Sequence, residues 1–235
     1  MHHHFLHRPM PRIALVLTIL AAGCEVPTID SPQDSSTSSK PTVTYATPLA
    51  CFKAMIESGR RGDLETYFTC FTDRTKRTLA GQALMMVAVT KQMVDNIPKT
   101  GNLQMGSARR QLRLMTEALN ENGISMELIE KFQQAGPMAM QDEAQLAKLL
   151  EPIADIDTVL VGFFGSLIEN SPVSLESLPT GTLDEANIEG DSATAMANLS
   201  NGNSILLNFQ KAGEGWKLDM NAAQLAEFNL AGMPQ

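Results

Sequence analysis

Histidine is almost absent from this chain of 235 residues, because all four histidines (His2, His3, His4 and His7) lie within its first seven positions. The rest of the chain therefore lacks Ser-His-Asp and Cys-His catalytic sets, histidine general bases and histidine metal ligands. No G-x-S-x-G motif, phosphate-binding loop or dinucleotide fingerprint occurs either. We therefore predict no catalytic residue, no metal site and no cofactor, and we expect a non-enzymatic protein.

Basic charge is also scarce: 18 Lys and Arg residues face 26 Asp and Glu residues, which gives a net charge of −8. A nucleic-acid partner is therefore not expected, because such a protein needs a basic face to neutralise phosphates. Hydrophobic residues make up 43% and charged residues 19%, which is typical of a folded chain. The length allows one sizeable domain or two small ones.

Long apolar runs are missing too. The run Ile13–Leu20 follows Arg8 and Arg12 and is shorter than the roughly 20 residues that cross a bilayer. A basic start, a short apolar stretch and small residues after it are typical of a cleaved export signal, so we expect residues 1–23 to be a signal peptide. A remnant of a His expression tag is a lesser alternative for His2–His4.

The segment Leu20-Ala21-Ala22-Gly23-Cys24 resembles a bacterial lipobox, with Ala21 where Leu is commonest. The resemblance implies cleavage between Gly23 and Cys24, a diacylglycerol on the Cys24 thiol, and a fatty acid such as palmitate on the new amine. Several acyl chains give stable membrane anchoring. Glu25, where Asp would favour the inner membrane, points to the outer membrane. An ordinary secretory signal with an incidental cysteine is the alternative.

Residues 24–47 contain three prolines, a Ser/Thr run at 35–39 and little to bury, so we predict a disordered tether. The expected location is the cell envelope, on its periplasmic or surface face, with the membrane as one partner through the lipid. One domain, residues 48–235, is expected to follow.

Helical spacing begins at Pro48, where Leu49, Phe52, Met55 and Ile56 form one apolar face. Gly59–Gly62 ends this helix and Asp63 can cap the next, which gives a helical hairpin. Cys51 and Cys70 are about equally far from the turn, so they should lie opposite each other. They are a candidate disulfide if their Cα atoms lie within roughly 7 Å, and two buried free cysteines are the alternative.

Residues 74–170 are predicted to add several helices. The spacing predicts them at 76–96, 107–120, 126–134, 138–150 and 155–170, separated by Pro and Gly residues. Arg109, Arg110 and Arg113 are expected on a solvated face, with an anion or lipid-headgroup site as a lesser alternative. The methionines of this segment are expected mainly in the core.

The apolar period changes to two after Pro179. Strands are predicted over 182–189, 193–199, 205–210 and 216–220, with turns at Gly190-Asp191, Asn201-Gly202-Asn203 and Gly213-Glu214-Gly215. A last short helix is predicted from Ala222 to Leu230. The predicted fold class is α+β: an N-terminal helical hairpin and a helical segment packed on a C-terminal four-stranded antiparallel sheet over residues 180–221.

Two pairs of segments resemble the nuclear-transport-factor-two-like superfamily, whose members have a cystatin-like, cone-shaped α+β fold. Residues 48–55 and 62–67 resemble its opening hairpin, and residues 189–195 and 215–219 resemble its last strands. Residues 74–170 depart from the family as a large helical insertion. This insertion is expected to be either a lid over the cone or a helical bundle beside an appended sheet.

The resemblance does not decide function, because the cone serves enzymes and non-enzymes. We expect a lipid-anchored envelope protein that binds a small apolar molecule, a lipid or a protein partner. A structural or assembly subunit is one alternative, favoured by a large exposed apolar patch. A histidine-free isomerase- or dehydratase-like enzyme is the other, favoured by a deep pocket with a buried, desolvated carboxylate beside Tyr67. Neither Tyr45 nor the carboxylate pairs Asp155/Asp157 and Asp184/Glu185 are expected to be catalytic.

Overall fold

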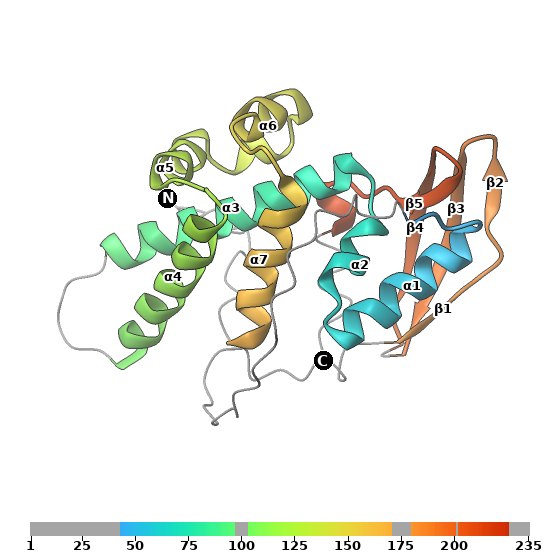
Figure 1. Cartoon of the computed structure of the whole chain (residues 1–235), viewed down its shortest axis with the longest axis horizontal. Helices are drawn as coiled ribbons and strands as arrows, with labels where there is room; N and C mark the ends of the chain where they lie inside the picture. Colours follow the sequence, from blue (N-terminus) through green and yellow to red (C-terminus); the bar gives the residue numbers. More distant parts are fainter. Residues whose placement is uncertain (1–42, 97–102, 171–179, 201, 226–235) are drawn as a thin grey trace, which may run out of the picture.

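The fold is seen in a computed structural model that describes residues 43–96, 103–170, 180–200 and 202–225 (Figure 1). The predicted signal peptide and most of the predicted tether lie outside these residues. Helices occupy the first part of the described chain and an antiparallel sheet occupies the last part. The predicted α+β class is therefore confirmed.

The predicted helical hairpin is formed by α1 (Pro48–Arg61) and α2 (Leu64–Thr69). Thr47 begins α1, because its hydroxyl accepts a hydrogen bond from the Ala50 backbone N–H at 3.1 Å. Gly62 ends α1 with a φ of 71°, a left-handed conformation that glycine adopts without steric cost. The Asp63 carboxylate then caps α2 by accepting from the Thr66 N–H at 3.1 Å. Local signals alone therefore fix this turn.

The helical segment comprises α3 (Asp73–Asn96), α4 (Leu103–Glu121), α5 (Met126–Ala135), the 3-10 helix η1 (Pro137–Met140), α6 (Glu143–Leu150) and α7 (Ile156–Glu169). The prediction of one helix over 138–150 is wrong, because this stretch holds η1 and α6. Asp142 separates them: its carboxylate accepts from the Ala144 and Gln145 N–H groups, both at 3.0 Å, and so begins a new helix.

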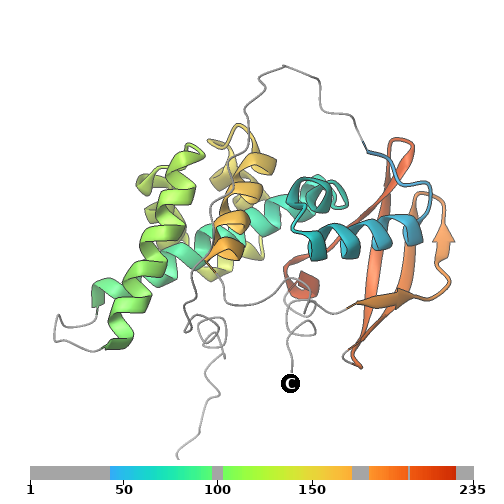
Figure 2. The same cartoon turned by 60° about the horizontal axis from the view of Figure 1, so that its bottom comes forward.

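These helices form a bundle beside the sheet. Of the two predicted arrangements, a lid over the sheet domain and a bundle beside it, the structure has the second. Figures 1 and 2 both place α3–α7 on one side of the α1–α2 hairpin and the sheet on the other. α3 contacts each of the other helices of the segment, and α7 contacts α2. The rings of Phe68 on α2 and Phe164 on α7 lie 5.7 Å apart, so the hairpin joins the two halves through an aromatic contact.

The sheet contains β1 (Gly181–Leu183), β2 (Asn187–Glu189), β3 (Ser192–Leu199), β4 (Ser204–Ala212) and β5 (Gly215–Leu218), in the order β1-β3-β4-β5. β2 also pairs with β3, so the strand predicted over 182–189 is interrupted. Leu183 pairs with Ala197 and Asn187 pairs with Thr194, which leaves three residues, 184–186, opposite two. This extra residue is a β-bulge, and it splits the predicted strand.

Helix α1 covers one face of the sheet. Ala193, Ala195 and Ala197 of β3 are buried on this face, and their small side chains leave room for the helix. Phe52 lies against Gly181, where an added Cβ would come within 3.3 Å of the Phe52 ring and 3.0 Å of the Asn198 carbonyl. The opposite face is exposed and mainly polar, with Met196 and Leu206 as a cross-strand pair.

The outer edge of β5 is covered by two segments from the hairpin region. Leu218 donates its N–H to the Cys70 carbonyl at 2.7 Å and accepts from the Thr72 N–H at 2.9 Å. Trp216 donates to the Tyr45 carbonyl at 2.8 Å. The edge strand is therefore paired with chain that precedes and follows the hairpin.

Candidate functional site

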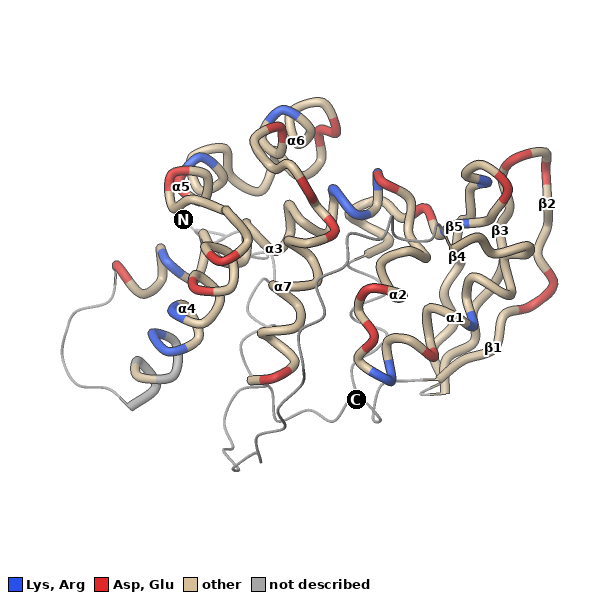
Figure 3. Tube along the Cα trace, viewed as in Figure 1, with Lys and Arg blue, Asp and Glu red and all other residues tan. Residues whose placement is uncertain are grey.

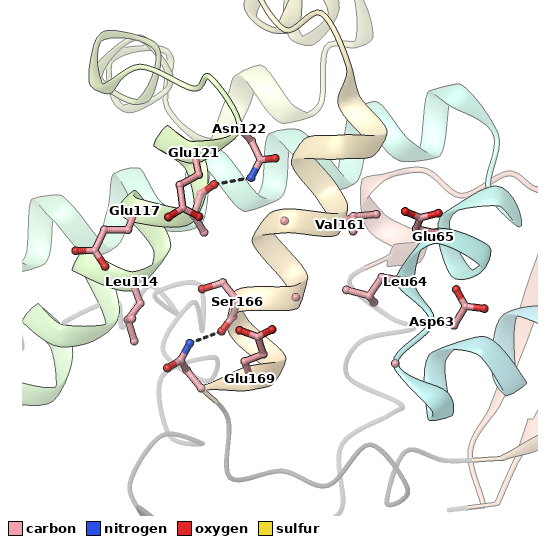
Figure 4. Close-up of a pocket in the computed structure, with 15 residues that line it drawn as sticks. Asp63, Leu64, Glu65, Leu114, Glu117, Glu121, Asn122, Val161, Ser166 and Glu169 are labelled. Atoms are coloured by element: carbon pink, nitrogen blue, oxygen red, sulfur yellow. Dashed lines mark hydrogen bonds between the residues drawn. The ribbon is translucent and has the colours of Figure 1, made fainter. Parts of the chain in front are cut away.

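A groove of about 630 Å³ lies over α7, between α2 and α4 (Figure 4). Val161, Gly165 and Ser166 form its floor on α7. Leu64 of α2 and Leu114 of α4 add apolar surface at the two sides. The groove is open to solvent, and the helices α4 and α7 that border it lie on the side of the hairpin away from the sheet (Figure 1).

Five carboxylates border this groove: Asp63 and Glu65 at α2, Glu117 and Glu121 on α4, and Glu169 at the end of α7. Figure 3 shows acidic positions on all three helices. No lysine or arginine is found among the residues of the described chain that line it. Glu117 itself lies beside a base on the same helix: Arg113 Nε is 3.8 Å from Glu117 Oε1, with both side chains more than half exposed. Among the described residues that line the groove, acidic side chains therefore outnumber basic ones, a balance that favours cationic groups.

The close approach of α4 and α7 at one end of the groove depends on Gly162. The Asn122 side chain lies over this glycine, where an added Cβ would overlap its amide. Asn122 is held there by donating from Nδ2 to the Ala118 carbonyl at 2.7 Å (Figure 4). Gly165 has more room, since the nearest atom to its added Cβ is Leu64 Cδ1 at 3.8 Å. Small residues on α7 thus leave space above its backbone.

The carboxylate pairs named from the sequence have local structural contacts. Asp155 begins α7 by accepting from the Thr158 N–H at 3.1 Å and hydroxyl at 2.7 Å. Asp157 forms an ion pair with Lys76 of α3, with Lys76 Nζ 2.8 Å from Asp157 Oδ1. Asp184 accepts from Asn198 Nδ2 at 2.9 Å, and Glu185 is exposed. The two members of each pair therefore have separate surroundings.

Cys51 and Cys70 are brought together as free, fully buried thiols. Cys51 Sγ donates to the Cys70 carbonyl at 3.4 Å, and Cys70 Sγ donates to the Tyr45 hydroxyl, also at 3.4 Å. The hydrogen bond with Cys70 and burial raise the pKa of Cys51, whereas the hydrogen bond from Cys51 holds the pKa of Cys70 below its ordinary value. The disulfide between them stays a prediction.

Tyr67 lies in an aromatic cluster, with its ring centroid 5.3 Å from Phe68 and 5.1 Å from Phe71. Burial raises its pKa, and Cys70 is the charged neighbour that adds to this shift. The described residues place no carboxylate among the groups that shift it. Phe52, Leu207 and Phe209 are almost fully buried, so side chains fill the space between α1 and the sheet.

The remaining predicted site residues are dispersed. Arg109, Arg110 and Arg113 are exposed on α4, as expected for a solvated face. Gly23 and Cys24 lie outside the described residues. Within the part of the chain that the structure places, no three His, Cys, Asp or Glu side chains are grouped to hold a metal ion. Over the same residues, no helix has the length and apolar character needed to cross a membrane.

The chain matches no known protein family, no curated protein and no solved structure. The resemblances to a lipobox and to the nuclear-transport-factor-two-like superfamily therefore stay predictions from the sequence. What the fold and the site define is an α+β protein with an open acidic groove on its helical half.

Sequence reasoning missed this groove. Asp63 was predicted only as a helix cap, and Glu65, Glu117, Glu121 and Glu169 were not singled out. Glu117 and Glu121 are four residues apart on one helix face, which is a local signal of an acidic stripe. No local pattern in the sequence indicates that acidic residues of α2 and α7 border the same groove as those of α4.

Proposed function

We propose that this chain is a lipid-anchored, non-enzymatic cell-envelope protein that binds a partner protein through the groove between α2, α4 and α7. The anchor is inferred from the sequence around Cys24. The observation that carries the binding function is the border of five carboxylates around a partly apolar floor, with no basic residue among the described lining residues.

The groove favours a cationic amphipathic helix of a partner protein over the other expected ligands. An apolar small molecule is best bound in a pocket that encloses most of its surface, but this groove is open. An anionic lipid headgroup would be repelled by the carboxylates. A helix with Lys or Arg along its edges and apolar residues on one face would contact both the acids and the apolar surface of Leu64, Leu114 and Val161.

The two alternative functions gain less support. An assembly subunit was expected to expose a large apolar patch, but the exposed large apolar residues come from separate elements, and Met196 and Leu206 are a directly paired couple among them. A cone-fold enzyme would be favoured by a desolvated carboxylate beside Tyr67, and among the described residues the causes that raise the pKa of Tyr67 are burial and Cys70.

Binding is tested with the full lipidated chain in non-ionic detergent and a fluorescent Leu/Lys amphipathic peptide helix. The variant with Glu117→Gln and Glu121→Gln should bind this probe roughly two- to thirtyfold more weakly, because it removes two exposed ion pairs of about 0.2–1 kcal/mol each. The matched control, Glu127→Gln with Glu130→Gln on α5, removes the same charge outside the groove and should bind as wild type. Binding should also weaken as salt is raised.

The location of the bound probe needs its own readout. A photo-crosslinking residue at position 114 in the groove should capture the peptide, whereas the same residue at position 206 on the outer face of the sheet should not. Equal weakening in both charge variants, or capture at position 206 alone, would refute the groove as the binding site. A Leu/Glu peptide that binds as well as the Leu/Lys peptide would refute the charge argument.

The anchor is tested separately by metabolic labelling with a fatty-acid analogue in a bacterial host. Wild type should carry the label and fractionate with membranes, and Cys24→Ala should do neither. An unlabelled wild-type chain would contradict the anchor without affecting the groove.

A further inference from the structure

The junction of α1, α2 and β5 buries two thiols that the proposed binding function does not use. Cys51 and Cys70 each have an exposed fraction of 0%, and they come from the two facing helical segments of the hairpin. Their hydrogen bonds form a short chain in which Cys51 donates to the Cys70 carbonyl and Cys70 donates to the Tyr45 hydroxyl. The same hydroxyl forms a hydrogen bond with Thr69 Oγ1 at 2.9 Å.

The short segment Val43–Thr47, which we call the strap, lies beside these thiols, because the Tyr45 hydroxyl accepts a hydrogen bond from Cys70 Sγ. Its Tyr45 is 8% exposed, and the Tyr45 carbonyl accepts from the Trp216 N–H of β5 at 2.8 Å. Gly215 lets the strap approach closely, since an added Cβ there would lie 2.8 Å from the Tyr45 backbone nitrogen. The backbone hydrogen bond to β5 and the Tyr45 side chain therefore hold the middle of the strap beside Cys70, and Thr47 joins its end to α1.

We propose that Cys51 and Cys70 form a site of reversible thiol–disulfide exchange and that the strap controls access to it. The reacting partner is an oxidised dithiol protein of the exporting compartment, or another disulfide of the same chemical class. This proposal is independent of the groove and of the peptide that binds there.

The exchange balances in two steps. The Cys70 thiolate attacks one sulfur of the partner's disulfide, the partner's S–S bond breaks, and its second sulfur leaves as a thiolate that takes up a proton. The deprotonated Cys51 then attacks Cys70 Sγ and displaces the partner's first sulfur, which is protonated in turn. The two thiols of this chain lose two protons and two electrons, and the partner's disulfide becomes a dithiol. The lowered pKa of Cys70 favours it as the first nucleophile.

Oxidation also weakens the strap's attachment. In the disulfide neither sulfur carries a hydrogen, so the bond from Cys70 to the Tyr45 hydroxyl is lost, and Thr69 is the partner that the hydroxyl retains. Docking of the strap and reduction of the thiols therefore favour each other, as linkage requires. The strap is continuous in sequence with the Pro- and Ser-rich segment that follows Cys24, so this coupling acts on the part of the domain nearest to the predicted anchor.

Access is measured by alkylating the full chain with a maleimide under native conditions and quantifying the Cys51 and Cys70 peptides by mass spectrometry, which keeps Cys24 separate. Tyr45→Ala should react about tenfold or more faster than wild type, because it removes the side chain over the thiols. Val43→Ala is the matched control in the strap, since Val43 is exposed, and it should react as wild type. Gly215→Val displaces the strap without changing either thiol or Tyr45 and should also react faster.

Exchange is measured in glutathione redox buffers of defined ratio. Both Tyr45→Ala and wild type should form the Cys51–Cys70 disulfide reversibly, and wild type should do so more slowly. Cys51→Ser should stop at a glutathione adduct on Cys70. Near-ultraviolet circular dichroism identifies a variant that unfolds, in which case Gly215→Val decides the result. Failure of both strap variants to speed alkylation would overturn the strap's role, and failure to form the disulfide in either chain would overturn the exchange site.

Discussion

The two halves of this molecule use the same helical hairpin in opposite ways. On the sheet side, α1 lies directly on the sheet, and Phe52, Met55 and Phe209 fill the space between them. On the helical side, α2 contacts α7 but leaves an open groove that extends to α4. The groove of this α+β protein therefore lies on the side of the hairpin away from the sheet. It offers charged groups on an open surface rather than an enclosed apolar cavity.

The difference between the halves follows from residue size. Alanines on β3 allow a bulky α1 face to approach the sheet and to fill the gap with aromatic side chains. On α7, by contrast, Gly165 and Ser166 line the open groove, and the nearest described atom to an added Cβ on Gly165 is Leu64 Cδ1 at 3.8 Å. Small residues thus accompany close packing between α1 and β3, and they border a groove on α7.

The largest expected effect comes from removing a large side chain from the core between α1 and the sheet. Phe52→Ala should lower the free energy of unfolding by about 3–5 kcal/mol, because it leaves a cavity between α1 and the sheet. Urea denaturation followed by circular dichroism measures this loss. Leu49→Ala, on the exposed side of the same helix, is the control and should change stability by less than about 0.5 kcal/mol. A small loss for Phe52→Ala would show that the interior can collapse and is less tightly filled than described.

The floor of the groove is tested at two glycines of α7. Gly162→Ala should lower the free energy of unfolding by about 1–3 kcal/mol, because its Cβ would overlap the Asn122 amide and push α4 away from α7. Gly165→Ala has room for its methyl group, and it should leave stability unchanged or raise it by up to about 1 kcal/mol through helix propensity. Thermal unfolding of the two variants gives the comparison, and equal effects at both glycines would contradict the described contact.

A smaller effect is expected where the bundle is held by charge. Lys76 has a side-chain exposure of 10% and pairs with Asp157, which is 43% exposed. Lys76→Met should lower the free energy of unfolding by about 1–2 kcal/mol, less than for a fully buried pair, because water can still solvate Asp157. Lys148→Met, at an exposed position of α6, serves as the control. Chemical denaturation at low and high salt measures both, and a Lys76→Met chain as stable as the control would contradict the pair's role.

The smallest effect is expected at the surface pair Lys91–Asp95 of α3, where Lys91 Nζ donates to Asp95 Oδ2 at 2.7 Å. This hydrogen bond raises the pKa of Lys91 above its ordinary 10.5. The pair's stabilisation, about 0.3 kcal/mol, is therefore complete below that value and lost as the pH rises through the folded pKa. Lys91→Ala should therefore be less stable than wild type by this amount at pH 7, and the difference between the two should disappear by pH 12. A difference from wild type that grows with pH would have the wrong sign.

Much of the fold follows from local signals in the sequence. The predicted ends of the helices at 126–134 and 155–170 lie within a residue of α5 and α7, because Ser125, Gly136 and Asp155 act on their own neighbours. The alternation of alanines on β3 likewise predicts which face of this strand is buried. The break at Asp142 and the bulge at 184–186 were missed, since the first competes with a continuous apolar spacing and the second needs the register of a partner strand.

The sequence by itself determined the α+β order of elements, the hairpin turn and the facing positions of Cys51 and Cys70, because each depends on residues close together in the chain. The tertiary structure alone decided that the helical segment stands beside the sheet and that acids from α2, α4 and α7 border one groove. Asp63, Glu121 and Glu169 meet there only through packing between helices. Such packing depends on the shapes of side chains distant in sequence, so no local pattern encodes it.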